Sequence, residues 1–218
     1  MGELLKRAKI NDFVRRSYNF DVRAESTERG YILTGRPIVY DQRTNLGAFD
    51  EIIDRGALDA ADLRDVRFLV NHDVKKIPLA RSRRNNGNST MQLTPDFEGL
   101  SLDWVQLDID NNAEARALYS AVQRKDITGM SFMFNIDGET WEDLESDHPT
   151  RHITKIGTVV EISAVTFPAY EGTEIYARNC EALDSARAAL ENARQSRAAT
   201  VDTALELEKA KFDFLLRR

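Results

Sequence analysis

The sequence predicts a mainly β protein of the α+β class, in which a small antiparallel β-barrel, closed or partly open, is flanked by helices and followed by a long helical tail. Short apolar stretches with a period of two recur along the first 180 residues, as half-buried strands require. All 11 glycines and all 5 prolines also lie before residue 180. Residues 181–218 are instead rich in Ala, Glu, Arg and Leu and contain no helix breaker, which favours one long helix.

The individual elements follow from local patterns. In chain order, strands are expected at residues 31–40, 66–70, 89–93, 100–107, 126–136 and 158–166. Helices are expected at residues 56–63, from Asn112 onward, and over the tail. Pro37 places the first strand at an edge or a bend. The residues between Pro95 and Gly99 join the third and fourth strands as a hairpin. Such short strands with few helices predict a small barrel or a curved sheet.

The stretch 126–136 (DITGMSFMFNI) raises the first functional question. Met130, Phe132 and Phe134 alternate on one face of the expected strand, which leaves Ser131 on the other. Gly129 precedes it and allows a tight turn. Ser131 is therefore either an ordinary small residue or a hydroxyl held out for chemistry.

Composition limits the classes of function. The net charge is −6 and the pI is near 5.2, so the chain lacks a general electrostatic footprint for nucleic acid, and its basic clusters are local. Cys180 is the single cysteine, which excludes an intramolecular disulfide and fits a reducing compartment. No apolar run reaches the roughly 18 residues of a membrane span, and the first residues lack the apolar stretch of a signal peptide. We therefore expect a cytosolic protein with neither nucleic-acid nor membrane partners.

Three segments are expected along the chain. Residues 1–19 form a basic extension, residues 20–179 form the main domain, and residues 180–218 form a helical tail. Apolar positions in the tail follow two short, shifted stripes, so a continuous coiled coil is not indicated. A segment that binds a partner, or one that is removed, fits this pattern better.

Two side chains look out of place on the expected strands. Glu161 lies in the middle of the apolar strand 158–166, where a carboxylate is costly to bury without a partner. It either faces water on an edge strand, pairs with an arginine, or has a role in chemistry. His72 directly follows the apolar strand 66–70, which is a good position for a proton carrier but also for a structural histidine bonded to a loop carbonyl.

Together Ser131, His72 and Glu161 supply a nucleophile, a base and an acid that orients the base, which is the set that acyl transfer needs. Their spacing is compatible with contact but does not require it. A metal-dependent hydrolase would need ligands such as His72, His148 and His152, yet no HExxH or similarly tight ligand spacing is present. From these residues alone, hydrolysis is one hypothesis among several.

The body of the sequence resembles the prohead (capsid maturation) serine proteases of tailed bacteriophages, which are related to the herpesvirus assembly proteases. The resemblance rests on phrases that come in the order of that family. They are GRPIVYD at 35–41, FDEIIDRGAL at 49–58, LVNHD at 69–73, EGLSL at 98–102, DITGMSF at 126–132 and EISAVTFPAY at 161–170. The phrases NHD, GMSF and EISAVTFPAY form a specific combination, and the match covers roughly residues 20–178.

The resemblance implies a compact β-barrel and a serine endopeptidase without metal or organic cofactor. It places the catalytic histidine at His72, the nucleophile at Ser131 and the third member at Glu161, with His152 as the alternative because the herpesvirus relatives use a second histidine. It implies that the enzyme works in the bacterial host cytoplasm inside the assembling prohead, and that the major capsid protein, scaffold segments and the chain itself are substrates. It leaves open a homodimer, and also a non-catalytic scaffold or assembly protein with the same fold.

Overall fold

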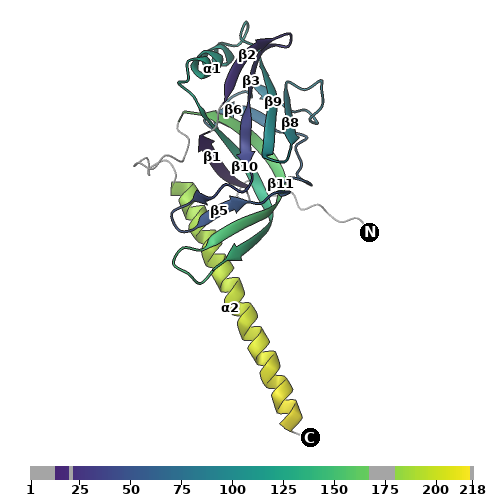
Figure 1. The fold of residues 1–218 in the computed structure, drawn as a ribbon, viewed down its shortest axis with the longest axis vertical. Helices are drawn as coiled ribbons and strands as arrows, with labels where there is room; N and C mark the ends of the chain where they lie inside the picture. Colours follow the sequence, from purple (N-terminus) through teal and green to yellow (C-terminus); the bar gives the residue numbers. More distant parts are fainter. Residues whose placement is uncertain (1–12, 20–21, 167–179, 217–218) are drawn as a thin grey trace.

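A computed structural model describes residues 13–19, 22–166 and 180–216, and it contains two sheets (Figure 1). The larger sheet contains β1 (Phe13–Asn19), β4 (Thr44–Asn45), β5 (Asp50–Ile53), β6 (Arg67–Val70), β7 (Ala80–Arg81), β10 (Gly129–Glu142) and β11 (Thr150–Val165). The smaller sheet contains β2 (Arg23–Thr27), β3 (Gly30–Val39), β8 (Met91–Pro95) and β9 (Gly99–Leu107) in the order β2-β3-β9-β8. The mainly β class with few helices is confirmed, as is the hairpin β8–β9.

The two sheets are not closed into a barrel, and the larger one is not purely antiparallel, so both parts of that expectation are corrected. The reason is β11, which has 16 residues and is longer than the strand expected at 158–166. It pairs with β10 on one side, and on the other side it pairs in parallel with β5 near one end and with β6 near the other. The sheet therefore branches along β11. The extra length was missed because residues 150–157 (TRHITKIG) are largely polar.

The alternation of β10 is confirmed by its packing. Met130, Phe132 and Phe134 are fully buried in the main hydrophobic cluster. The rings of Phe132 and Phe134 stack with centroids 4.9 Å apart. Because successive side chains of a strand point to opposite faces, this packing fixes the opposite direction for Ser131.

The helix expected from Asn112 is confirmed as α1 (Ala113–Gln123), which contacts β2, β3 and β9 of the smaller sheet. The Asn112 side chain accepts hydrogen bonds from the backbone N–H groups of Glu114 and Ala115 at 2.9 and 3.2 Å, as an N-cap does. The helix expected at 56–63 is wrong. That segment makes successive tight turns, and Gly56 has φ +88°, a left-handed conformation that a right-handed helix excludes.

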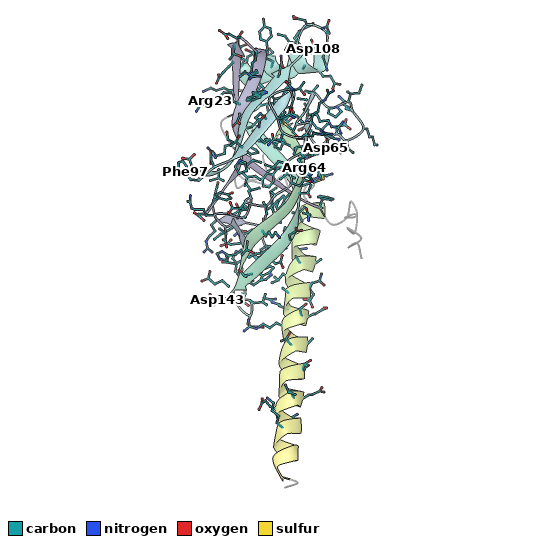
Figure 2. The ribbon with its side chains drawn as sticks, turned by 90° about the vertical axis from the view of Figure 1, so that its right-hand side faces the viewer. Arg23, Arg64, Asp65, Phe97, Asp108 and Asp143 are labelled. Carbon is teal, nitrogen blue, oxygen red and sulfur yellow. The ribbon has the colours of Figure 1, made fainter. Side chains whose placement is uncertain are left out.

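The tail forms the long helix α2 (Cys180–Leu216), as expected, and it extends well beyond the sheets (Figure 1). Leu190 anchors it on a small apolar cluster with Leu46, Phe49 and Leu144. Arg194 donates from Nε to the carbonyl oxygen of Leu144 at 3.0 Å. Figure 2 shows Asp143, in the turn between β10 and β11, at the end of the body that lies beside α2. Within the described residues, no helix is long and apolar enough to cross a membrane.

Candidate active site

Three serines form a row across adjacent strands of the larger sheet. Ser17 of β1 lies opposite Ser131 of β10, and Ser131 lies opposite Ser163 of β11. Directly opposed residues of paired strands present their side chains on the same face, about 5 Å apart. Glu161 is two residues before Ser163, so it shares this face. The sheet therefore brings Ser131 and Glu161 together on one surface, opposite the face that Phe132 buries.

His72 reaches this surface through an unusual turn after β6. Asn71 and His72 have φ angles of +52° and +58°, in the left-handed region that L residues adopt rarely. The Asn71 side chain fixes the turn, because its Nδ2 donates to the Thr166 hydroxyl at 3.0 Å and its Oδ1 accepts from the Thr166 N–H at 2.9 Å. The backbone N–H of His72 then donates to the Ser163 hydroxyl at 3.0 Å. The turn thus places His72 directly over β11.

The His72 ring contacts the carboxylate of Glu161. Its Nδ1 lies 2.6 Å from Glu161 Oε2, and the Ser163 hydroxyl donates to the other oxygen, Oε1. The Glu161 side chain is only 4% exposed and that of His72 is 15% exposed. Glu161 therefore lies on an interior strand with a histidine partner, rather than at a solvated edge. Arg67 of β6 is opposite Glu161 in the sheet, but its guanidinium binds Asp65. With Nδ1 bound to this carboxylate, Nε2 is the ring nitrogen left to accept another proton.

Ser131 is fully buried and its hydroxyl is engaged by β1. Its Oγ donates to the backbone carbonyl oxygen of Arg16 at 2.8 Å and accepts from the Ser17 hydroxyl at 2.7 Å. Among the contacts of the described residues, Ser131 and His72 share no hydrogen bond, and one strand spacing separates Ser131 from the Ser163 hydroxyl to which His72 is bonded. A rotation of the Ser131 side chain away from β1 would direct its hydroxyl toward β11, to which His72 is bonded.

The other two histidines lie elsewhere. His152, the alternative third member, is nine residues before Glu161 on β11, and its Nδ1 lies 2.8 Å from Asp54. His148 Nε2 lies 2.9 Å from Asp50. Burial raises the pKa of Asp50, but hydrogen bonds from His148 and an arginine outweigh this effect and hold that pKa below its usual range. In the described part of the chain, no group of three or more metal-binding side chains could hold an ion.

Ser163 and Asn71 complete the surroundings of the pair, and neither was assigned a role from the sequence. Ser163 had one signal, because it lies two residues after Glu161 on the same face of the expected strand. Asn71 precedes His72 in the NHD phrase, but its bond to Thr166 depends on a turn that local sequence does not specify. Ser17 lies in the basic extension and gave no signal at all.

Comparison with protein families gives a match over most of the chain. Residues 18–186, more than three quarters of the chain, match the model of a family described as caudovirus prohead serine protease. The matched range contains His72, Ser131, Glu161 and Ser163. No curated protein and no solved structure matches the chain.

Proposed function

We propose that this chain, which belongs to the caudovirus prohead serine protease family, is a serine endopeptidase in which Ser131 is the nucleophile, His72 the general base and Glu161 the group that orients the base. Membership of the family gives the chain a protease role in capsid maturation, within the assembling prohead. The observation that carries the assignment of residues is the 2.6 Å contact between His72 Nδ1 and the buried Glu161 carboxylate, on the face of the sheet that holds Ser131.

The chemistry follows from this arrangement. The Glu161 carboxylate accepts a hydrogen bond from the Nδ1–H of His72, which keeps the Nε2 lone pair of His72 free. As Ser131 Oγ attacks the carbonyl carbon of a peptide bond, its proton passes to Nε2, and Glu161 stabilises the resulting imidazolium. His72 then gives the proton to the leaving amine, the C–N bond breaks, and an acyl-enzyme remains. Water, deprotonated by the same nitrogen, hydrolyses the ester and restores the serine.

Ser163 links His72 and Glu161. Its hydroxyl accepts a hydrogen bond from the backbone N–H of His72 and donates one to Glu161, so one buried group connects the base and the carboxylate. A hydrogen bond from a neutral donor also satisfies a carboxylate oxygen that would otherwise be buried without a partner. Ser163 therefore acts as a positioning residue, through its effect on the other two.

We infer that the substrates are segments of scaffold and capsid proteins, and the chain itself. Helix α2 fits either of two roles in this activity. It extends beyond the body and is held on it by the small cluster around Leu190, so it is accessible both for docking to the shell and for removal. Either role of α2 is compatible with a monomer or with a homodimer in the shell.

A reagent that phosphonylates activated serines tests the assignment without a known substrate. The full-length protein is incubated with a fluorophosphonate, and the site of the adduct is mapped by peptide mass spectrometry. We expect one adduct on Ser131, none in Ser131→Ala, and a strongly reduced rate in His72→Ala. An adduct on another serine, or equal labelling of Ser131 in His72→Ala, would contradict the proposal. If the wild-type protein is not labelled either, the result would favour the non-catalytic assembly protein.

A further inference from the structure

Strand β1 covers the nucleophile. It pairs antiparallel with β10 over its whole length, from Phe13 opposite Asn135 to Asn19 opposite Gly129, and it is the terminal strand at its edge of the larger sheet. Five of its seven residues precede the range 18–186 that matches the family. Without β1, the edge of β10 beside Ser131 would offer unpaired backbone groups, which is how extended peptides are bound by strand addition.

The peptide bond of β1 that lies at the nucleophile joins Arg16 and Ser17. Ser131 Oγ is 2.8 Å from the carbonyl oxygen of Arg16. Because a carbonyl carbon is about 1.2 Å from its oxygen, the carbon of this bond lies within about 4 Å of Oγ. Reacting atoms in a near-attack arrangement are separated by about 3–3.5 Å. The Arg16–Ser17 bond therefore occupies the position that a substrate bond would take.

The Arg16 side chain occupies a site that matches its shape and charge. It is 3% exposed, and its guanidinium binds the carboxylate of Glu51 through two parallel hydrogen bonds, from Nε to Oε1 and from Nη2 to Oε2, the latter at 2.7 Å. Glu51 is 1% exposed, so the charge pair is desolvated. The neighbouring Arg15 is exposed, so this strand buries one arginine selectively. Such two-pronged contacts are specific for arginine, because a lysine ammonium lacks the planar fork.

A second arginine, Arg151, also contacts the Glu51 carboxylate. Arg151 Nη1 lies 3.4 Å from Glu51 Oε2, and the same guanidinium binds Glu139 at 2.9 Å through Nε. Arg151 therefore keeps a partner of its own when Arg16 is absent, and Glu51 keeps a cation nearby. The Glu51 carboxylate therefore keeps a charged neighbour when β1 departs, and it can bind another arginine in the place of Arg16.

We propose that β1 lies in the place of the substrate strand, and that Glu51 selects an arginine immediately before the bond to be cut. The inference rests on the proposed function. A substrate segment pairs with β10 once β1 has left, its arginine reaches Glu51, and the carbonyl of that arginine faces Ser131. Ser131 Oγ bonds to this carbonyl carbon, the C–N bond to the next residue breaks, and His72 carries the proton from Oγ to the released amine. Water then frees the arginine carboxylate.

Two peptides based on the sequence of β1 test the role of Glu51. They are Phe-Val-Gln-Arg-Ser-Tyr-Asn and Phe-Val-Gln-Met-Ser-Tyr-Asn, which differ only at the position of Arg16. We expect the full-length protein to cleave the first peptide after arginine, with a kcat/KM about 100-fold above that of the second. In Glu51→Gln this ratio should fall below about tenfold. Both peptides are cleaved by the same fraction of the enzyme, the folded molecules in which β1 is displaced. The ratio of the two kcat/KM values therefore does not change when a variant is less stable.

The control variant is Glu114→Gln, which alters an exposed carboxylate on α1 that pairs with Lys76, and it should keep the preference. Cleavage at another bond, an equal rate for both peptides, or an unchanged ratio in Glu51→Gln would overturn the inference and leave the protease assignment intact. The inference also fails if neither peptide is cut by a protein whose Ser131 reacts with a fluorophosphonate. If Ser131 does not react either, the proposed function fails first.

A reversible lock tests whether β1 must leave. Arg15 and Met133 lie directly opposite each other on β1 and β10, so cysteines at both positions can cross-link the strands. The variant is Arg15→Cys with Met133→Cys, in a chain that also carries Cys180→Ser. We expect the oxidised protein to lose at least about 100-fold of the peptidase activity that its reduced form shows. Equal activity of the two forms would show that substrate does not need the place of β1.

Discussion

Replacing Glu161 by glutamine is the most informative single substitution, because it removes one charge and changes almost nothing else. The side chain is 4% exposed and its volume stays the same, so the change leaves no cavity. Glutamine can present an N–H group to His72 Nδ1 in place of an acceptor, which would favour the wrong ring tautomer. The imidazolium that forms during catalysis would also lose its negative partner.

The size of the effect follows from the contact distance. With 2.6 Å between His72 Nδ1 and Glu161 Oε2, the centres of the two charges lie about 4 Å apart. At an effective dielectric constant of about 20, such a pair attracts by about 4 kcal/mol. Because each 1.36 kcal/mol changes a rate about tenfold, losing this stabilisation should slow formation of the imidazolium about 1,000-fold.

The assay is the second-order rate of fluorophosphonate labelling at Ser131, followed by intact mass, in the wild type and Glu161→Gln. Glu114→Gln is the control, because Glu114 lies on α1 and pairs with the exposed Lys76. It should label at the wild-type rate. A Glu161→Gln rate within about fivefold of the wild type would refute the assignment of Glu161 as the partner that supports His72.

Three further predictions concern the surroundings of the site and the fold. Ser163→Ala should slow labelling about 10- to 100-fold, because it removes the hydroxyl that connects the imidazole and the carboxylate. The pKa of Asp96 is held at about 2 by the Arg36 guanidinium, so its contribution to stability is present above the usual value of 3.8 and is lost as pH falls toward 2. Urea unfolding of Asp96→Asn should show a loss of about 1 kcal/mol at pH 7, since the pair is partly exposed, and only a small part of that loss at pH 2. Gly99→Ala should destabilise by about 3 kcal/mol in the same assay, because its φ is +151° and a Cβ would collide with the Ile38 carbonyl oxygen.

Two of these three predictions have a matched control variant. Ser82 is fully buried, and its hydroxyl accepts from the backbone N–H of Val66 and donates to the carbonyl oxygen of Leu63. Ser82→Ala should therefore lower stability but not the labelling rate. Equal rate losses for the two serine variants would remove the special role of Ser163. Gly87→Ala has open space and should be neutral, so equal losses in both glycine variants would contradict the steric argument. A loss for Asp96→Asn that persists unchanged at pH 2 would contradict the linkage.

Much of the fold could be predicted from the sequence because it depends on local patterns. The alternation around Ser131 predicted the strand and its buried face, and the capping side chain of Asn112 predicted the start of α1. The lack of helix breakers gave α2. The turns that follow Gly56 were mistaken for a helix, since the apolar residues there have helical spacing, but the backbone forms successive tight turns and then bonds to Gly157 of β11.

What the sequence could not give are features of pairing and of the turn at His72. The parallel partners of β11 come from distant segments, so the branching of the sheet has no local signal. The left-handed conformations of Asn71 and His72 are held by Thr166, which is 95 residues from Asn71 in the chain. The cover that β1 provides over Ser131, and the pairing of Arg16 with Glu51, depend on contacts between the extension and the body. These tertiary contacts were beyond any local pattern.

The central claim is that Ser131 makes this chain a protease of capsid maturation. The measurement that tests it most directly is the intact mass of the capsid protein with which the chain assembles, after proheads form with either the full-length wild type or Ser131→Ala. We predict that the capsid protein is shortened in proheads that contain the wild type and stays whole in those that contain Ser131→Ala. Shortening of the capsid protein by both would contradict the assignment of Ser131, and shortening by neither would contradict the proposed activity on this substrate.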